Sequence, residues 1–417
     1  MTTDRTPIRR RLAIRGRTHR PPWGARKAGH DSILAPIAAT VAATVAVGVS
    51  VGVGLVLARS ERERRRARQQ RLERELALWP GEPLARGLHR MALAQADLAI
   101  ELLGGDARAE TTAGRLAAPG ERIATRTPRG GSPDERAVHE TRKALKRLRA
   151  LLRLLAHELG DEAYAREGAA LRDIARELAL ARDAAVMLGT LDRLIERHPR
   201  KLGRRRSVRE LRRRLRAEHE RTQRLALSDP ADYAAVLGAL LAFRRRAGAW
   251  SLTERPGIQL VDADLERIYR QGRARYRRVA RREGDRAIAM HRWRKRVKDL
   301  RYAAEMLDHR SRSGARAPDA RLRKLARRAD ELGELLGEEH DLAVFAERLR
   351  AGARSERRET WRTGRRARKQ LLGLIAERRR ALRKRALRAG KQLYAERPRR
   401  FIRGIRTAHA ASARRLS

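Results

Sequence analysis

Between about residue 84 and residue 411, hydrophobic positions recur every three or four residues with charged side chains between them. This spacing predicts amphipathic helices, because an α-helix completes a turn in about 3.6 residues. The sequence has no run of alternating apolar and polar residues of the kind that a half-buried strand requires. We therefore expect an all-α protein built from helix bundles. The predicted helices cover residues 84–103, 136–158, 162–197, 205–228, 230–248, 260–284, 286–309, 319–350, 356–388 and 390–411.

Two segments that contain glycine and proline interrupt this helical region. Residues 104–135, which begin with Gly104-Gly105, show no periodicity and are predicted to form a loop. The second interruption is the sequence "RPGIQ" at residues 255–259. It divides the helical domain, predicted at residues 84–410, into halves at about 84–250 and 258–410.

The N-terminal part of the chain has a different pattern. Residues 1–32 are basic and aperiodic, and we expect them to be disordered. Residues 33–58 are an uncharged run of 26 residues, which is long enough for a transmembrane helix of about 20 apolar residues. A signal peptide has a shorter apolar region nearer the start, and a buried helix of this length between Arg-rich flanks is less natural. Residues 59–83 are then a basic juxtamembrane linker.

The charges that flank residues 33–58 predict the orientation of this segment. The more basic flank of a membrane span generally stays in the cytoplasm. Residues 18–32 carry three cations, whereas residues 59–73 carry seven arginines. We therefore expect a single-pass protein of the cytoplasmic membrane, with its C-terminal domain in the cytoplasm and the basic flank near anionic lipid.

The chain has 101 Lys and Arg residues against 50 Asp and Glu, which gives a formal charge of +51. A field of this size predicts a polyanionic partner, such as nucleic acid, anionic lipid or a phosphate polymer. The chain has 91 Arg and only 10 Lys, and part of this preference for arginine is typical of a GC-rich coding bias. The absence of cysteine excludes disulfides, thiolate metal sites and a cysteine nucleophile.

A basic pattern occurs twice, 152 residues apart. The stretch "VHETRKALKRLRALLRLL" at residues 138–155 aligns without a gap with "MHRWRKRVKDLRYAAEML" at residues 290–307. On a helix, the shared basic positions fall within about 120° of arc. The opposite face is apolar in both copies: in the first it consists of Leu148, Leu151, Leu152 and Leu155, and in the second of Val297, Leu300, Ala303, Ala304 and Leu307. The first cationic stripe contains His139, Arg142, Lys143, Lys146, Arg149 and Arg153, and the second contains His291, Arg294, Lys295, Lys298 and Arg301.

Such a stripe could be an ordinary solvated helix face. Solvated faces usually mix charges, because interspersed carboxylates relieve repulsion between neighbours on the helix. The first stripe contains no carboxylate, and only Glu305 enters the second. Four of the ten lysines, Lys143, Lys146, Lys295 and Lys298, lie at matching positions of the two copies in a chain that otherwise favours arginine. A compact ammonium group suits an irregular row of phosphate oxygens, so the stripes predict a bound polyanion.

A weaker repeat follows each basic stretch. Residues 178–191 resemble residues 332–349, with Asp183 matching Asp341 and Val186 matching Val344. A single aspartate after a helix turn is more often a cap or a supporting partner than a catalyst, and this is the interpretation we favour.

The doubled pattern His-x-x-Arg-Lys-x-x-Lys-x-x-Arg, with Tyr302 after the second copy, resembles the CHAD family (conserved histidine α-helical domain) over roughly residues 84–410. The resemblance implies two pseudo-symmetric four-helix bundles whose basic helices line a central groove that binds inorganic polyphosphate. It implies that the residues of the two cationic stripes, together with Tyr302, form the polyphosphate-binding set. Many relatives also carry an N-terminal triphosphate-tunnel domain with a Glu-x-Glu-x-Lys strand motif, which this sequence lacks.

The sequence favours binding over catalysis. Arg and Lys share the face of each motif histidine and would repel a metal cation, so we expect no metal and no cofactor. We find no P-loop, dinucleotide turn or HExxH motif, and "GEEHD" at residues 337–341 is the nearest cluster of acidic residues and histidine. The expected function is non-catalytic polyphosphate binding. A groove histidine with a pKa near 6.5 would make this binding tighter as the pH falls from 8 to 6.

The alternative is a basic RNA- or ribosome-associated protein. The net charge predicts non-specific nucleic-acid binding at low salt. Trp293 and Tyr302 are the aromatic residues near the motifs, whereas single-strand binding sites generally have more stacking platforms. The Arg-rich tracts at residues 204–216 and 362–369 could touch RNA or could be solvated helices, and the oligomeric state stays open.

Overall fold

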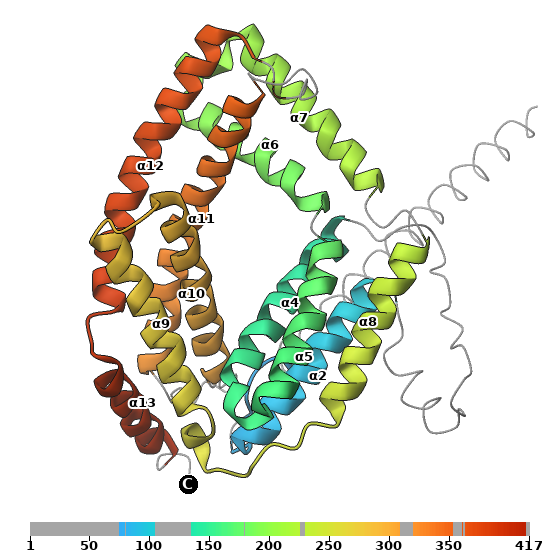
Figure 1. Cartoon of the computed structure of the whole chain (residues 1–417), viewed down its shortest axis with the longest axis vertical. Coiled ribbons are helices and arrows are strands. Elements are labelled where there is room, and N and C mark those ends of the chain that lie inside the picture. Colours follow the sequence, from blue (N-terminus) through green and yellow to red (C-terminus); the bar gives the residue numbers. More distant parts are fainter. Residues whose placement is uncertain are drawn as a thin grey trace, which may run out of the picture. The chain divides into compact units, whose positions relative to one another are not determined.

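The computed structural model describes residues 75–79, 81–104, 135–178, 180–225, 230–308, 320–352, 361 and 363–413 (Figure 1). The predicted all-α class is confirmed, because the regular elements of these residues are helices and none of the described residues forms a strand. The elements are α2 (Leu84–Leu102), α4 (Glu135–Leu154), α5 (Ala156–Glu177), α6 (Leu180–Arg197), a π-helical turn η1 (Pro199–Gly203), α7 (Arg206–Leu225), α8 (Pro230–Gly248), a 3₁₀ turn η2 (Gly257–Leu260), α9 (Asp262–Ala280), α10 (Arg286–Leu307), α11 (Ala320–Ala351), α12 (Arg365–Leu393) and α13 (Pro398–Ala413).

The predictions for the N-terminal region lie outside the described residues. They concern the disordered segment at 1–32, the transmembrane helix at 33–58 and most of the linker at 59–83. The predicted loop at 104–135 falls largely on residues 105–134, which are also outside. Of the helices that the structure does describe, none combines the length and the apolar character needed to cross a bilayer.

The helix boundaries differ from the prediction at several places. The helix predicted at 356–388 begins only at Arg365, in α12, and residues 363–364 before it are not helical. The predicted helix at 162–197 is two helices, α5 and α6, and α5 starts earlier and bends at Gly160, where φ is 75°. The predicted boundary between 388 and 390 was wrong, because α12 continues through Gly390 to Leu393. Pro398 then begins α13, since a proline has no N–H and fits the first turn of a helix.

One hydrophobic cluster joins the first group of helices. Contacts link α2 with α4 and α8, and α5 with α4 and α8, so that these four helices pack side by side (Figure 1). The same hydrophobic cluster also includes buried residues of α9, α10, the first half of α11 and α13. The predicted apolar faces of the two motif helices belong to this cluster, which confirms the helical register of both copies.

A second hydrophobic cluster joins α6, η1 and α7 to the C-terminal half of α11 and to α12. It includes Leu191, Leu211, Phe345 and Leu371, which are fully buried. Both clusters therefore take helices from each side of residues 251–256, so the packing crosses the boundary predicted between the two halves.

Gly390 marks the closest approach of α12 to its neighbours. A Cβ atom at this position would lie 2.6 Å from Cζ2 of Trp293 and 2.7 Å from Cδ2 of Tyr276. Trp293 is fully buried, so its ring has no room to move aside. The glycine is therefore required by packing and does not end the helix.

We expect Gly390→Ala to lower the free energy of unfolding by about 1–3 kcal/mol, because the added methyl group overpacks the contact with Trp293. Gly373→Ala on the same helix is the control, since a Cβ atom there meets nothing within 4 Å. That change should be neutral or should stabilise the protein by about 1 kcal/mol. Urea-induced unfolding measures both, and equal effects would contradict the packing argument.

Candidate functional site

The two copies of the basic motif lie on helices that contact each other. The first copy is on α4 and the second on α10, and these helices pack together and against α9. Their apolar faces are buried, which leaves the cationic faces toward the surface. The predicted site residues are exposed at His139, Lys143 and Lys295, and half-buried at Arg142, Lys146, Arg149, Arg153, His291, Arg294, Lys298, Arg301 and Tyr302.

Arg153 connects the two motif helices. Its guanidinium group lies 3.3 Å from the carboxylate of Asp299 on α10, which is buried. Arg296 reaches the same carboxylate at 3.2 Å, and Arg267 of α9 donates a hydrogen bond of 2.8 Å to the carbonyl of Arg153. The sequence assigned Arg153 to the anion-binding stripe, whereas the structure shows it in an ion pair that holds α4 to α10.

Arg149 lies in a group of cations from three helices. Burial lowers the pKa of Arg149 below its usual value, and repulsion from Arg153, Arg172 and Arg296 lowers it further, although Asp299 opposes this shift. A guanidinium in this position is short of negative charge, so an added anion would stabilise it. Arg172 on α5 and Arg296 were missed by the sequence analysis, because the periodicity of one helix says nothing about cations that a neighbouring helix contributes.

Arg301, the counterpart of Arg149 in the second copy, has carboxylate partners. Its Nε donates a hydrogen bond of 2.7 Å to Glu305, and Asp330 of α11 pairs with its Nη1. Burial acts to lower the pKa of Arg301, but Glu305 and Asp330 raise it above the usual value. The guanidinium also lies 5.6 Å from the centre of the Tyr302 ring. Equivalent positions of the repeat are therefore electrostatically different.

His291 packs against a second histidine. Its ring centre lies 4.6 Å from that of His340 on α11, and the rings are tilted by 37°. Burial, together with the positive charges of Lys295 and Arg294, lowers the pKa of His291 below its ordinary value. Its Nδ1 is buried and accepts or donates no hydrogen bond among the described residues. Within that part of the chain, no three His, Cys, Asp or Glu residues come together in a way that could hold a metal ion.

The glutamates of the acidic cluster at residues 337–341 form ion pairs with arginines. Glu338 pairs with Arg197 at 2.8 Å and with Arg378 at 2.6 Å. Burial acts to raise the pKa of Glu338, but the hydrogen bonds from Arg378 and Arg197 lower it below its usual value. Glu339 is buried and binds Arg379 and Arg383 of α12, each within 3.0 Å. These carboxylates hold α6, α11 and α12 together.

The two aspartates of the weaker repeat join α6 to α11. Asp183 of α6 lies 3.1 Å from Arg348 of α11, and Asp341 of α11 lies 3.7 Å from Arg193 of α6. Each aspartate thus pairs with an arginine of the other helix. This agrees with the interpretation of both residues as supporting partners.

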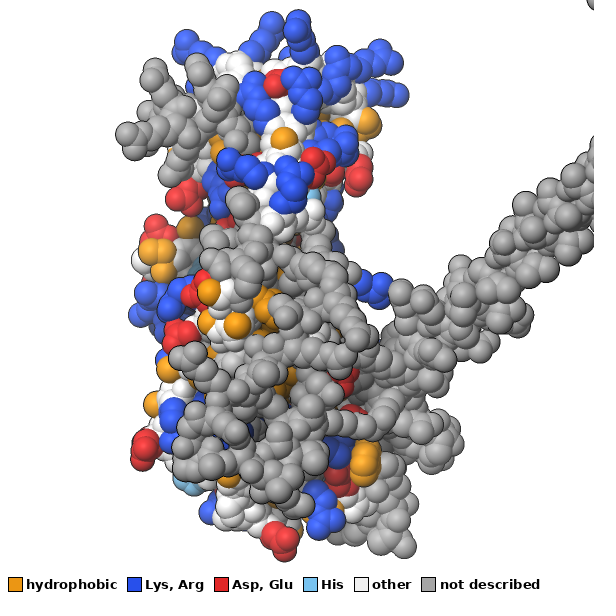
Figure 2. Space-filling model, turned by 90° about the vertical axis from the view of Figure 1, so that its right-hand side faces the viewer, with side chains coloured by type: hydrophobic (Ala, Val, Ile, Leu, Met, Phe, Trp, Pro, Cys, Tyr) orange, Lys and Arg blue, Asp and Glu red, His pale blue; other side chains and the backbone are white. Residues whose placement is uncertain are grey.

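The Arg-rich tract at residues 204–216 runs into α7. Figure 2 shows Lys and Arg side chains gathered at the upper end of the view, where Figure 1 places one end of α7 and one end of α12. Arg212 pairs with Asp192 at 2.6 Å, and Arg213 and Arg214 pair with Glu210. Other arginines of the tract, including Arg209 and Arg216, are exposed. The tract is a partly neutralised surface helix that adds to the positive field.

A family model and the fold of one solved structure agree with this architecture. The family model of the CHAD domain matches residues 121–350, which include both motif helices. The crystal structure of the CHAD domain from the plant Ricinus communis is 20% identical, with a TM-score of 0.50 over 78% of this chain and 96% of that chain. PptA from Streptomyces chartreusis is 16% identical, with a TM-score of 0.48 over 76% of this chain and 100% of that chain. No curated protein matches the chain.

Proposed function

The chain belongs to the CHAD domain family, and from this premise we propose that it binds inorganic polyphosphate without catalysis through the cationic faces of α4 and α10. One observation carries the proposal: two copies of His-x-x-Arg-Lys-x-x-Lys-x-x-Arg lie on helices that contact each other, with their apolar sides buried. Packing thereby concentrates cations from both copies on neighbouring surfaces. A linear polyanion can neutralise such a surface without any base-specific contact.

Four lysines are the first contacts that we assign. Lys143 and Lys295 are exposed, and Lys146 and Lys298 follow three residues later on the same faces. Lys143 lies 2.8 Å from Glu140, but both side chains are more than one third exposed, at 45% and 38%. An exposed pair of this kind contributes little stability, so Lys143 can exchange Glu140 for a phosphate group.

Arg149 and its neighbours supply a second contact point. Arg153, Arg172 and Arg296 each repel the guanidinium group of Arg149, and the buried carboxylate of Asp299 offsets only part of this repulsion. A phosphate group bound there would remove the repulsion and would accept several charge-assisted hydrogen bonds. Arg153 and Arg301 act differently in this proposal, because their ion pairs to Asp299 of α10 and to Asp330 of α11 position neighbouring helices.

The absence of catalysis is also part of the proposal. Its support is the ion pairing of the carboxylates on either side of His340, the histidine that packs against His291. Glu338 and Glu339 each bind two arginines, and Asp341 pairs with Arg193, so none of the three is placed as a general acid or base.

We extend the proposal to the symmetry that the family implies, with two related four-helix bundles around a groove. Its support is the reciprocal pairing of α6 and α11, in which Asp183 binds Arg348 and Asp341 binds Arg193. Reciprocal contacts are typical of elements related by a two-fold axis. On α6, Arg193 follows Asp183, and on α11, Arg348 follows Asp341, but the two separations along the chain differ. The proposed symmetry therefore relates the two helices and does not match them residue by residue.

Replacing the four motif lysines tests the proposed function. We expect Lys143→Glu, Lys146→Glu, Lys295→Glu and Lys298→Glu together to weaken binding of long-chain polyphosphate by on the order of 100-fold or more at physiological salt, because four phosphate contacts become repulsive. Binding can be measured by the competition of unlabelled polyphosphate with a labelled chain.

The chain offers a matched control for this variant. Lys201, Lys324, Lys369 and Lys384 are all exposed and lie outside the motifs. Their replacement by Glu changes the net charge by the same amount, so it measures the effect of the overall field alone. If both fourfold variants bind polyphosphate equally well, the motif faces are not the binding site.

The pH dependence of binding tests the role of His291. A bound phosphate chain raises the pKa of a neighbouring histidine, so binding takes up a proton and becomes tighter as the pH falls. Because the pKa of His291 is already lowered in the free protein, the increase should continue to a lower pH than it would for a histidine with the ordinary pKa of about 6.5. Each unit by which the ligand raises this pKa adds up to about tenfold in affinity at low pH.

Affinity for long-chain polyphosphate from pH 8 to pH 5 measures this effect. His291→Gln should flatten the curve, whereas His157→Gln, which changes an exposed histidine of α5, should leave it unchanged. An identical curve for wild type and His291→Gln would remove His291 from the binding site.

We also propose that residues 33–58 anchor the protein in the cytoplasmic membrane with its C-terminal domain in the cytoplasm. The support is the uncharged run of 26 residues and the seven arginines that follow it. Protease added to intact cells should leave the C-terminal domain uncut, and protease added after lysis should degrade it. Recovery of the full-length chain in the soluble fraction would contradict the anchor.

A further inference from the structure

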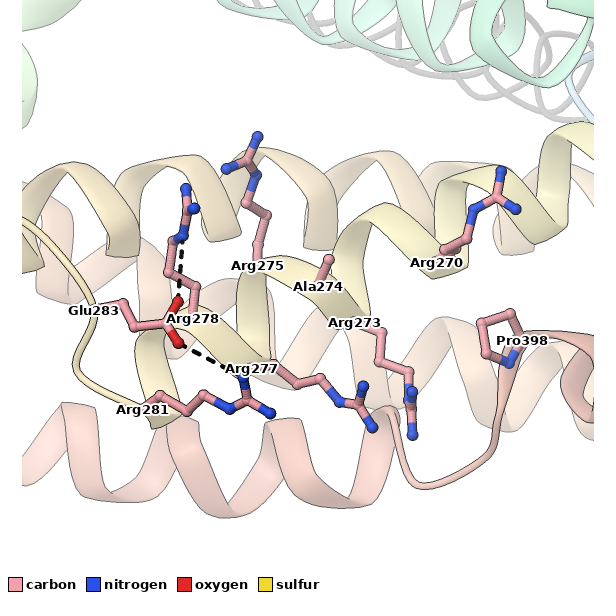
Figure 3. A pocket seen from close by; sticks show the side chains of 9 residues that line it. All are labelled: Arg270, Arg273, Ala274, Arg275, Arg277, Arg278, Arg281, Glu283 and Pro398. Carbon is pink, nitrogen blue, oxygen red and sulfur yellow. Dashed lines mark ion pairs between the residues drawn. The ribbon is translucent and has the colours of Figure 1, made fainter.

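A second basic surface lies on α9, outside the two motif copies. Residues 270–281 contain six arginines and no acidic residue. Arg273, Arg277 and Arg281 follow one another at intervals of four residues, so they lie within about 80° of arc on the helix. In Figure 3, Arg273 and Arg277 point toward the neighbouring helix, whereas Arg270, Arg275 and Arg278 point to the other side of α9.

The neighbouring helix is α12, which completes a groove with α9. Two cavities lie along α9, of about 500 Å³ and about 710 Å³, and Arg273 and Arg277 line both of them. The larger cavity is closed on its other side by Arg388 and Lys391 of α12. Residues 378–395 contain no acidic residue, so both walls of this groove are positively charged.

Few carboxylates neutralise this groove. Glu283 lies 3.7 Å from both Arg278 and Arg281, at one end of the smaller cavity (Figure 3). Arg273 is held in place by a hydrogen bond of 3.1 Å from its Nε to the carbonyl of Tyr394. Arg277, Arg388 and Lys391 form no ion pair with any residue that the structure describes.

The floor of the larger cavity is formed by aromatic side chains, unlike the cationic faces of α4 and α10. Tyr276 is half-buried and stacks on Tyr394, with ring centres 5.9 Å apart and an angle of 26° between the rings. The volume of about 710 Å³ is within the range of small-ligand sites. An aromatic floor contributes nothing to the binding of a bare phosphate polymer. It does suit a polyanion that also carries rings.

We propose that the groove between α9 and α12 binds a short segment of single-stranded nucleic acid. The phosphate groups lie along Arg273 and Arg277 on one wall and along Arg388 and Lys391 on the other. A base contacts the exposed edge of Tyr276, and the planar guanidinium groups offer further surfaces on which bases stack. Arginine prevails in this groove, whereas lysines are kept at matching positions of the motifs, which is consistent with two different ligands.

This site is independent of the proposed polyphosphate site. Its lining residues belong to α9, α12 and the residues that follow them, and the four motif lysines line neither cavity. A substitution that abolishes one site therefore leaves the other in place.

The test is binding of a fluorescently labelled 12-nucleotide oligouridylate and of long-chain polyphosphate to the full chain at physiological salt. Arg277→Glu with Arg388→Glu should weaken oligouridylate binding at least about tenfold. It should also reduce the magnitude of the salt slope by about 1.4, or about 0.7 for each phosphate group that is no longer neutralised. Arg221→Glu with Arg245→Glu is the matched control, because both residues are exposed on α7 and α8. Thermal unfolding checks that each variant is folded.

A second variant distinguishes the two ligands. Tyr276→Leu keeps an apolar side chain but removes the ring, so oligouridylate binding should fall by roughly tenfold while polyphosphate binding stays unchanged. The proposal is overturned if the groove variant binds oligouridylate as well as the control does. It is also overturned if Tyr276→Leu has no effect on oligouridylate and the groove variant loses polyphosphate to the same degree, because the groove would then recognise phosphate alone.

Discussion

The fold depends on a small number of buried carboxylates that hold arginines from different helices together. Asp299 binds Arg153 across the contact of α4 and α10, and Glu339 binds two arginines of α12. Glu167, which is fully buried on α5, accepts two hydrogen bonds from Arg246 of α8, of 2.8 and 2.9 Å. Removing one partner of such a pair leaves an uncompensated charge inside the protein, at a cost of about 3–5 kcal/mol. In a chain of net charge +51, each of these carboxylates offsets positive charge where two helices meet.

The same constraint separates cations that build the structure from cations that are left for a ligand. Arg153 and Arg301 have the sequence features of binding residues, and in the structure each forms an ion pair with a carboxylate of a neighbouring helix. Lys295 on α10 is exposed and forms no ion pair with a residue of the described ranges. Arg149 is partly buried among other arginines, with Asp299 as the nearby negative charge. A polyanion that settles on α4 and α10 therefore meets positive charge that the fold itself has not neutralised.

Most of the fold could be predicted from the spacing of leucine and alanine, because helical periodicity depends on local sequence. The buried faces of α4 and α10, with Leu148 and Leu300, followed directly from it. The C-terminal end of α12 could not be predicted in this way, because Gly390 is required by its contact with the ring of Trp293 on another helix. The candidate site was found through its repeat, but the ion pairs of Arg153 and Arg301 involve α10 and α11, and no pattern within one helix reveals a partner on the next. The groove of α9 was missed for the same reason, because α9 and α12 each supply only one wall.

The salt dependence of polyphosphate affinity tests the central claim most directly, because its slope counts the phosphate groups that the protein neutralises. If the lysines of both motif copies bind one chain, the logarithm of the association constant should fall linearly with the logarithm of salt concentration, with a slope of about −3 or steeper for four or more contacts. A slope shallower than about −1 would mean that at most one or two phosphate groups are neutralised. That result would contradict a binding surface assembled from α4 and α10.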